Sequence, residues 1–257
     1  PHQADWLLLV RELVARGHTV VSVLHEVSFA LQADDVAVLA AGLAAMPVAQ
    51  AQYLDRGWTL EVSVGKTSFK DVEQSGLDQL TRDFFDSFAL PVQTLASTLD
   101  TRDRSLALQA GYRFNRWLAA DVGFFSLGSF QYASTGTVDD AGTIRPSAFT
   151  FGYKVRGVSV GGTATLPLGR NLELRARAGI ANSDVNIRYS AAVDTDTLAD
   201  KYSDTSQDLY YGVGAGFVVW DYYRIGVDYL HYDKVGKASS TGTASVDNVM
   251  LTLGFRY

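Results

Sequence analysis

The sequence predicts an all-β chain: an eight-stranded antiparallel up-and-down transmembrane β-barrel, preceded by a short α/β fragment. Three observations lead to this fold class. From residue 57 onward, apolar residues recur at every second position. The connections between these segments alternate between very short and long polar stretches. After residue 42, no apolar run approaches the ~18 residues that a membrane helix needs, so strands must carry any membrane role there.

Composition excludes several classes of function. The 257 residues carry a net charge of −6 and include no cysteine. The acidic balance offers no basic surface that would favour nucleic acid as a partner. Without cysteine, disulfides, thiolate catalysis and cysteine-based metal sites are excluded. We expect neither a cofactor nor a metal site.

Residues 1–42 have an α/β pattern. "QADWLLLVRELVARG" has apolar residues at helical spacing, "HTVVSVL" suits a buried strand, and "HEVSFALQAD" suits a short helix. This order resembles the tail of an ABC transporter ATPase, where a histidine after a strand contacts the nucleotide γ-phosphate; His25 takes that position. The phosphate-binding loop, the signature motif and an acidic Walker B strand are all missing from the sequence, so we interpret residues 1–42 as a non-functional fragment.

Residues 36–51 resemble the apolar core and cleavage site of a secretory signal. The segment is rich in small and apolar residues and closes on Ala49-Gln50-Ala51, which would make Gln52 the first mature residue. Asp34 and Asp35 stand where a signal would carry Lys or Arg. A fused, misassembled or mis-started reading frame explains this overlap better than a working two-domain protein. The alternative is a small subdomain followed by an alanine-rich linker.

The barrel strands follow in order within residues 52–257. The alternating segments are "WTLEVSVG", "SLALQAGYRF", "LAADVGFF", "FTFGYKVRGVSVGGTATLP", "LELRARAGI", "YGVGAGFVV", "RIGVDYL" and "NVMLTLGFRY". The fourth segment shifts phase between Val155 and Val158, which predicts a β-bulge near Gly157.

The connections and the aromatic residues suggest a membrane setting. Short turns are expected at Asn115-Arg116, at 169–171 and at Asp221-Tyr222, and long polar loops at about 70–103, 131–147, 186–207 and 235–245. Aromatic residues flank the strands at both ends, which predicts two interfacial girdles. The girdle near the short turns comprises Trp58, Phe114, Trp117, Trp220, Tyr222, Tyr223 and Tyr257, and the opposite girdle comprises Phe69, Phe130, Phe149, Phe151, Tyr189 and Tyr232.

Charged residues share the strand face with glycines, opposite the apolar face. Such a face suits the lumen of a narrow barrel, in which buried charges must be paired. We therefore expect ion-pair networks that plug the lumen, formed by Glu61, Arg113, Asp121, Glu173, Arg175, Arg177, Arg224, Asp228 and Arg256. A closed barrel with a structural or surface-interaction role is favoured, and a small ion or solute channel is the alternative.

Three motifs resemble the OmpA-type eight-stranded outer-membrane barrel: "GYRFNRWLAADVGFFSLGSF", "LPLGRNLELRARAGI" and the terminal "NVMLTLGFRY". The resemblance covers residues 57–257. It implies a Gram-negative outer-membrane protein, monomeric, in contact with lipid and lipopolysaccharide, and inserted by the barrel assembly machinery. The assembly signal that it implies consists of Val249, Leu251, Leu253, Phe255 and Tyr257.

Two further features bear on function. His231 is the only histidine after His25, and it falls on the lipid-facing phase, where we interpret it as an interfacial residue. We assign no catalytic residue and expect no enzyme. Within residues 75–100, Leu77, Leu80, Phe84, Phe85 and Phe88 recur at helical spacing, which predicts a short amphipathic helix over the barrel mouth, ended by Pro91.

Overall fold

The computed structural model describes residues 56–257, and all of them belong to one compact unit. The ATPase-like fragment of residues 1–42 and the signal-like segment of residues 36–51 lie outside the described residues. Within the described part of the chain, no helix is long and apolar enough to cross a bilayer.

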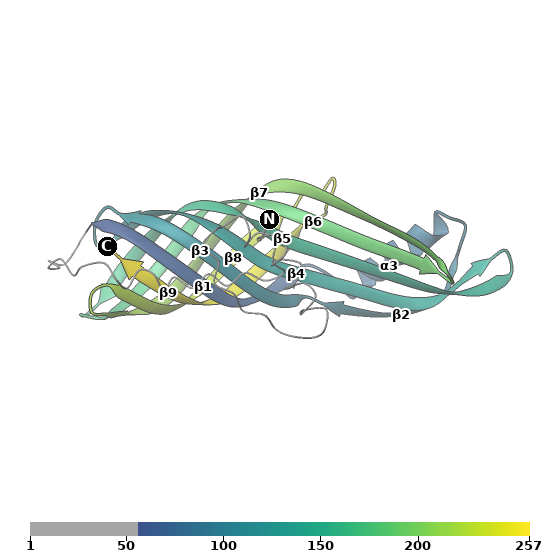
Figure 1. Ribbon diagram of the computed structural model, residues 1–257, viewed down its shortest axis with the longest axis horizontal. Helices are drawn as coiled ribbons and strands as arrows, with labels where there is room; N and C mark the ends of the chain where they lie inside the picture. The colour runs from purple at the N-terminus through teal and green to yellow at the C-terminus, as the bar shows by residue number, and fades with distance from the viewer. Residues whose placement is uncertain (1–55) are drawn as a thin grey trace, which may run out of the picture. The chain divides into compact units, whose positions relative to one another are not determined.

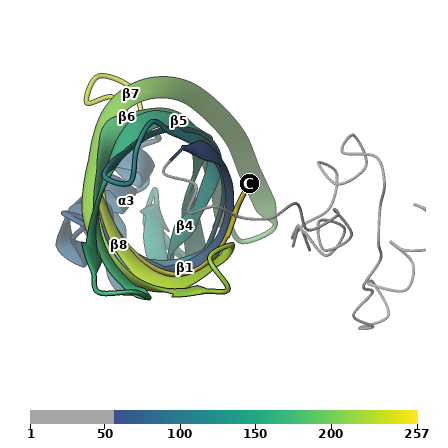
Figure 2. The ribbon, with the colours of Figure 1, turned by 90° about the vertical axis from the view of Figure 1, so that its left-hand side faces the viewer.

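Eight antiparallel strands close into a ring (Figures 1 and 2). The ring closes where the first strand pairs with the last, Thr59 to Lys70 against Ser245 to Arg256. This confirms the predicted up-and-down barrel of eight strands. In chain order its members are β1 (Gly57–Lys70), β3 (Arg102–Arg113), β4 (Leu118–Asp140), β5 (Thr143–Leu168), β6 (Leu172–Val193), β7 (Asp196–Val219), β8 (Tyr223–Val235) and β9 (Ala244–Arg256).

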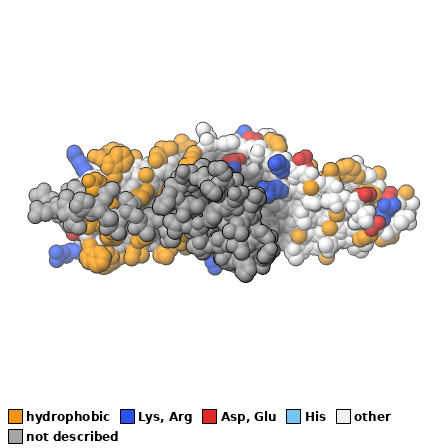
Figure 3. Space-filling view, viewed as in Figure 1, with side chains coloured by type: hydrophobic (Ala, Val, Ile, Leu, Met, Phe, Trp, Pro, Cys, Tyr) orange, Lys and Arg blue, Asp and Glu red, His pale blue; other side chains and the backbone are white. Residues whose placement is uncertain are grey.

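Apolar side chains form a band around the outside of the ring. On β7, the outward side chains between Leu209 and Val219 are largely exposed and apolar, a stretch of the about 9–11 residues with which a tilted strand crosses a bilayer. Figure 3 shows hydrophobic side chains gathered over the left half of the molecule. We call this surface the apolar band; its exposed members include Val64, Val122, Phe124, Val158, Val160, Ile180, Leu209, Val213, Phe217, Ile225, Val227, Val249, Leu251 and Leu253.

One end of the barrel carries the short turns and one predicted aromatic girdle. The turns lie between β3 and β4, between β5 and β6, and between β7 and β8, as predicted. Trp58, Phe114, Trp117, Trp220 and Tyr257 are exposed at this end, between 42% and 78% of each residue. We call it the short-turn end, and its girdle matches the prediction.

The opposite end differs from the prediction, because two of the four expected loops are strands. The ladder between β4 and β5 continues to Asp140 and Thr143, and the ladder between β6 and β7 continues to Val193 and Asp196. These strands run past the ring to the right in Figure 1. Their outward residues are polar because they lie beyond the apolar band, which is why this part of the sequence reads as loop. The loop predicted at 235–245 is present between β8 and β9.

The segment predicted as the loop 70–103 holds a helix and a further strand. Strand β2 (Val92–Asp100) pairs with β4 from Gln131 to Val138, outside the ring. Together with the outer parts of β4, β5, β6 and β7 it forms a five-stranded sheet beyond the ring. We call this sheet, with its helix, the extension.

Helix α3 (Gln74–Asp86) confirms the amphipathic helix, although it packs on the extension as well as on the mouth. Phe85 is 3% exposed and packs with Tyr132 and Phe149 on the inner face of the extension. Leu77 contacts both this cluster and the apolar cluster in the lumen. Leu80 and Phe88, predicted to lie on the apolar face, are 45% and 56% exposed.

Strand β5 has no bulge at Gly157; a bulge lies instead in its neighbour β4. Strand β5 pairs with β6 without interruption through Gly157, so the bulge prediction there was wrong. The register shifts instead in β4, between Ser126 and Gly128, where φ of Gly128 is +76°. The change of phase in the sequence has another cause: Val155 faces the lumen and is fully buried, whereas Val158 faces outward in the apolar band.

Residues 52–257 are expected to refold in detergent micelles without residues 1–51, because β1 pairs with β9 and closes the ring. The measurement is the gel mobility of unheated and heated samples, which separates the compact barrel from the unfolded chain. A matched fragment that also lacks β9 should show no compact form. A 52–257 fragment that stays unfolded where the full chain folds would contradict this boundary.

Candidate functional site

The lumen holds a charged layer near the short-turn end, and its first group is centred on Glu61. Arg175 donates to both Glu61 carboxylate oxygens, with Nη1 2.5 Å from Oε1 and Nη2 3.2 Å from Oε2. Arg177 donates to Oε2 at 2.7 Å and also bonds Gln109. The side chain of Arg177 is 5% exposed. The single negative charge of Glu61 therefore offsets one of the two positive charges, and both arginines donate hydrogen bonds to its oxygens.

The second group is centred on Arg224, whose side chain is 1% exposed. Its Nε donates to Glu173 at 2.8 Å, and its two terminal nitrogens each lie 3.2 Å from an oxygen of Asp228. Arg256 donates to the other oxygen of Glu173 at 2.5 Å. Two arginines and two carboxylates therefore balance one another, as a low-dielectric interior requires.

Glycines make room for these side chains. A Cβ at Gly216 would lie 2.5 Å from Nε of Arg224, and a Cβ at Gly226 would lie 2.6 Å from its Nη2. A Cβ at Gly214 would lie 2.0 Å from Oδ1 of Asp228. The glycines around Arg224 and Asp228 are therefore a steric requirement, since a side chain at these positions would clash with the ion pair.

Asp121 and Arg113 also face inward but occupy the margins of the charged layer. Asp121 accepts from the hydroxyl of Thr163 at 2.8 Å, and Thr163 in turn accepts from Arg177. Arg113 donates to the backbone carbonyl of Arg116 in the turn. Both line a small cavity of about 30 Å³. All nine charged residues predicted for the lumen lie there, and seven of them form the ion pairs of the two groups described above.

Uncharged polar residues complete the layer, and the strand pattern alone does not predict their role. Gln109 and Thr163 bridge Arg177 to its surroundings, and Ser63 and Thr252 lie 2.8 Å apart across a strand pair. Their inward phase in the strand pattern was the available signal, although it does not reveal which partner each one meets.

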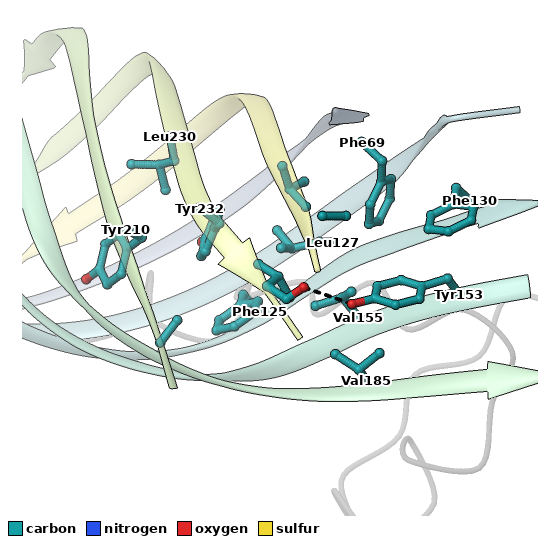
Figure 4. Packing of buried hydrophobic residues seen from close by; sticks show 14 of the residues in the cluster. Phe69, Phe125, Leu127, Phe130, Tyr153, Val155, Val185, Tyr210, Leu230 and Tyr232 are labelled. Carbon is teal, nitrogen blue, oxygen red and sulfur yellow. Dashed lines mark hydrogen bonds between the residues drawn. The ribbon is translucent and has the colours of Figure 1, made fainter. Parts of the chain in front are cut away.

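The lumen beyond the charged layer is filled by apolar side chains, which we call the lumen cluster. Tyr232 stacks on Tyr210 with 5.6 Å between ring centroids and lies 5.2 Å from Phe125 (Figure 4). Leu127 and Val155 are fully buried among them. The full cluster comprises Phe69, Ala107, Phe125, Leu127, Phe130, Tyr153, Val155, Ala181, Val185, Ile187, Tyr210, Leu230, Tyr232, Val235, Ala244, Val246 and Met250.

The second predicted aromatic girdle is wrong. The six aromatic residues assigned to it lie on the inward face of the barrel or of the extension: Phe69, Phe130, Phe149, Phe151, Tyr189 and Tyr232. Four of them, Phe69, Phe130, Phe149 and Tyr232, are buried, with exposed fractions of at most 4%. They were assigned to the lipid interface because they lie at the strand ends opposite the short turns. The inward face was expected to be polar along its whole length, whereas it is polar only near the short turns.

The loop between β8 and β9 lies over the end of the lumen cluster. The hydroxyl of Tyr153 donates to the carbonyl of Val235 at 2.9 Å (Figure 4). Asp204 accepts from Lys237 at 2.6 Å and from Ser240 at 2.7 Å. These hydrogen bonds lower the pKa of Asp204 to about 2. A carboxylate with a depressed pKa holds its partners at neutral pH and releases them only as the pH falls through that value.

His231 lies on the outside of β8, as its phase predicts. Its Nδ1 is 2.7 Å from Oδ1 of Asp247, and the hydroxyl of Tyr229 donates to the same oxygen at 2.8 Å. Among residues 56–257, no serine hydroxyl is hydrogen-bonded to this histidine. In the same part of the chain, no cluster of three histidines or acidic residues could hold a metal ion.

The predicted assembly signal lies on the outer face of β9. Val249, Leu251 and Leu253 are each more than half exposed in the apolar band. Phe255 packs against Tyr223, with 5.5 Å between ring centroids. Tyr257 exchanges two backbone hydrogen bonds of 2.8 Å with Trp58 and so joins the end of the chain to the first strand.

Replacing both Phe255 and Tyr257 with asparagine is expected to lower the amount of barrel in the outer membrane severalfold, because both aromatics lie on the outer side of the closing strand. Immunoblots of membrane fractions measure this level. Trp220→Asn is the matched control, since this aromatic is 78% exposed at the same end but outside β9. An unchanged level for the double variant would remove the assembly role.

Comparison with known proteins gives one match that covers most of the chain. The model of the outer membrane protein β-barrel domain matches residues 36–257. The match leaves out residues 1–35, and the ATPase-like fragment finds no support in it. No curated protein sequence matches the chain.

Solved structures with similar architecture are distant in sequence. Neisserial surface protein A is 11% identical with a TM-score of 0.45, over 78% of this chain and 97% of that chain. The attachment invasion locus protein Ail of Yersinia pestis is 14% identical with a TM-score of 0.42, over 79% and 97%. OprG of Pseudomonas aeruginosa is 12% identical with a TM-score of 0.40, over 78% and 96%. On the evidence of the domain match and its closed eight-stranded ring, the chain belongs to the outer-membrane β-barrel protein family of Gram-negative bacteria.

Proposed function

We propose that this protein is a surface-interaction barrel: a closed, non-enzymatic anchor that carries a rigid binding platform outside the cell. The observation that carries the proposal is the extension. Outer-membrane barrels keep short turns on the periplasmic side and longer segments outside. The extension therefore faces the exterior, with five strands and a helix in place of the flexible loops of a plain barrel.

The extension is built as a small folded unit. Its inner face buries Phe85, Tyr132, Val138 and Phe149 against α3. The hydroxyl of Tyr132 donates to Asp78 at 2.7 Å, which ties the helix to β4. Burial of the hydroxyl raises the pKa of Tyr132, so it stays a neutral donor at physiological pH. A surface held in one shape loses less entropy on binding than a mobile loop.

Two strand edges of the extension offer a way to bind a partner. In the described chain, β2 pairs with β4 alone. The outer part of β7, from Asp196 to Asp208, pairs with β6 alone, because β8 pairs only with Leu209 to Val219. An unpaired edge presents backbone donors and acceptors to which an extended peptide can add.

The contents of the lumen support an anchor rather than a pore. The charged layer and the lumen cluster lie in succession along the barrel, and an eight-stranded barrel is only just wide enough for its own side chains. The expected surroundings are outer-membrane lipid and lipopolysaccharide around a monomer inserted by the barrel assembly machinery.

A barrel with a shortened extension tests the proposed role. Residues 71–100, 131–152 and 188–201 would each be replaced by a tight turn, which leaves the apolar band and the buried residues of the lumen cluster in place. Cells carrying the native barrel should adhere to host-cell monolayers or matrix-coated surfaces more strongly than cells carrying the shortened barrel at equal surface level. Equal adhesion of both strains, and of a strain without the protein, would contradict the interaction role.

A further inference from the structure

The two open strand edges of the extension differ in charge. Residues 92–99 of β2 include no charged residue, whereas residues 196–208 of β7 include five. The loop between β8 and β9 also bonds the side chains of Asp204 and Ser206 on β7. Charged side chains and a covering loop both oppose the addition of a further strand to an edge. The edge of β2 lacks this protection.

The open backbone groups of β2 belong to Leu95, Ser97 and Leu99. In an antiparallel ladder, both backbone groups of a residue point to the same side, and the side alternates along the strand. The amide of Asp139 on β4 donates at 3.0 Å to the carbonyl of the residue just before β2. Through the register of the two strands, this alternation directs residues 96 and 98 toward β4. Leu95, Ser97 and Leu99 therefore direct their amides and carbonyls away from β4.

This open edge is complementary to itself. When two copies meet antiparallel about Ser97, Leu95 of each copy lies opposite Leu99 of the other, and the two Ser97 residues lie opposite each other. The leucine pairs cover side chains that are half-buried in one copy. Such cross-strand pairs are the contacts that stabilise a sheet. In one copy the Ser97 carbonyl accepts at 3.0 Å from the amide of Gln74, an exposed side chain on α3 that can turn away.

The direction of β2 decides how two paired copies are placed. Strand β2 runs along the long axis of the molecule (Figure 1). Two barrels in one membrane point the same way, so their β2 strands cannot lie antiparallel. An antiparallel pair instead directs the two barrels away from each other, into two membranes that face one another. We propose that β2 binds β2 of a second copy in the facing membrane. This inference rests on the proposed interaction role and names the partner.

The strength of this contact depends on the number of copies and on salt. A few backbone hydrogen bonds give weak pairing between two single copies, whereas many copies on each membrane bind together with much higher avidity. The extension is also acidic, because residues 71–100, 131–152 and 186–208 contain 13 Asp and Glu and four Lys and Arg. Two extensions therefore repel each other until salt screens their charges. Pairing should be stronger at 150 mM than at 10 mM salt, where the Debye length falls from about 30 Å to about 8 Å.

The test uses the full chain in phosphatidylcholine vesicles, with aggregation measured by turbidity at 150 mM salt. Native vesicles should aggregate, with turbidity about fivefold above that of protein-free vesicles. Vesicles that carry only Ser97→Lys or only Ser97→Asp should stay dispersed, because like charges then lie directly opposite at the centre of the pair. A mixture of these two vesicle populations should aggregate again, because opposite charges then meet. Ser203→Lys, on the open part of β7, is the matched control and should aggregate as the native protein does.

Each contrary result overturns the pairing of β2 with itself. These results are dispersed native vesicles, a mixture of the two Ser97 variants that stays dispersed, or a loss of aggregation in Ser203→Lys. Aggregation of native vesicles with protein-free vesicles would also overturn it, since lipid would then be the partner. Unchanged heat-modifiable mobility verifies that every variant is folded. Adhesion to matrix-coated surfaces tests the interaction role by itself, so adherent cells together with dispersed native vesicles would reject the self-pairing alone.

Discussion

Replacing Arg224 with methionine is expected to destabilise the barrel by about 3–5 kcal/mol, because removal of one partner leaves buried charge without compensation. Arg224 is the only ion-pair partner of Asp228 among the described residues, and both side chains are at most 5% exposed. Glu173 would keep its bond from Arg256. The free energy of unfolding in phosphatidylcholine vesicles, followed by tryptophan fluorescence in urea, measures the effect.

Arg156→Met is the matched control for this experiment. It breaks the pair with Asp184 on the outer surface, where the arginine is 62% exposed. An exposed pair contributes at most about 1 kcal/mol. Similar small losses for both variants would mean that water solvates Arg224 in an open lumen, which is contrary to the buried network.

Phe125→Ala and Phe124→Ala form the second comparison, because these neighbours on β4 face opposite sides. Phe125 is 5% exposed in the lumen cluster, whereas Phe124 is 67% exposed in the apolar band. Truncation of Phe125 is expected to cost about 3–5 kcal/mol, since it removes packing and leaves a cavity. Lipid can fill the space left by Phe124, so only the transfer term of about 1.5–3 kcal/mol is lost there. The same unfolding measurement compares the two variants. A smaller loss for Phe125 than for Phe124 would contradict a dry lumen cluster.

Much of the barrel could be predicted from the sequence because its side-chain period is two and its outer face meets lipid. Every strand of the band alternates apolar with small or charged residues, and this pattern marks both the strand and its inward face. The strands of the extension were not predicted, because their outward face does not meet lipid and so carries no apolar alternation. Beyond the band, the outward residues of β6, such as Asn182 and Asn186, face water, so the strand resembles a polar loop in sequence.

The membership of the charged layer could be predicted, but its pairing could not. Glu61 and Arg177 are 116 residues apart in the chain and meet across the lumen. Which side chains meet across the lumen depends on the tilt and register of the strands in the closed sheet. The alternation within one strand gives no information on either. The aromatic residues of the lumen were misplaced because their position at the strand ends suits a lipid interface as well as it suits an apolar lumen.

Planar-bilayer recording of the refolded native barrel tests the closed lumen most directly. Because the charged layer and the lumen cluster lie in series along the barrel, we expect no stepwise conductance above the lipid background, at either polarity and at protein levels confirmed by gel mobility. Steady, reproducible openings from the folded native barrel would contradict it and would establish the ion or solute channel instead.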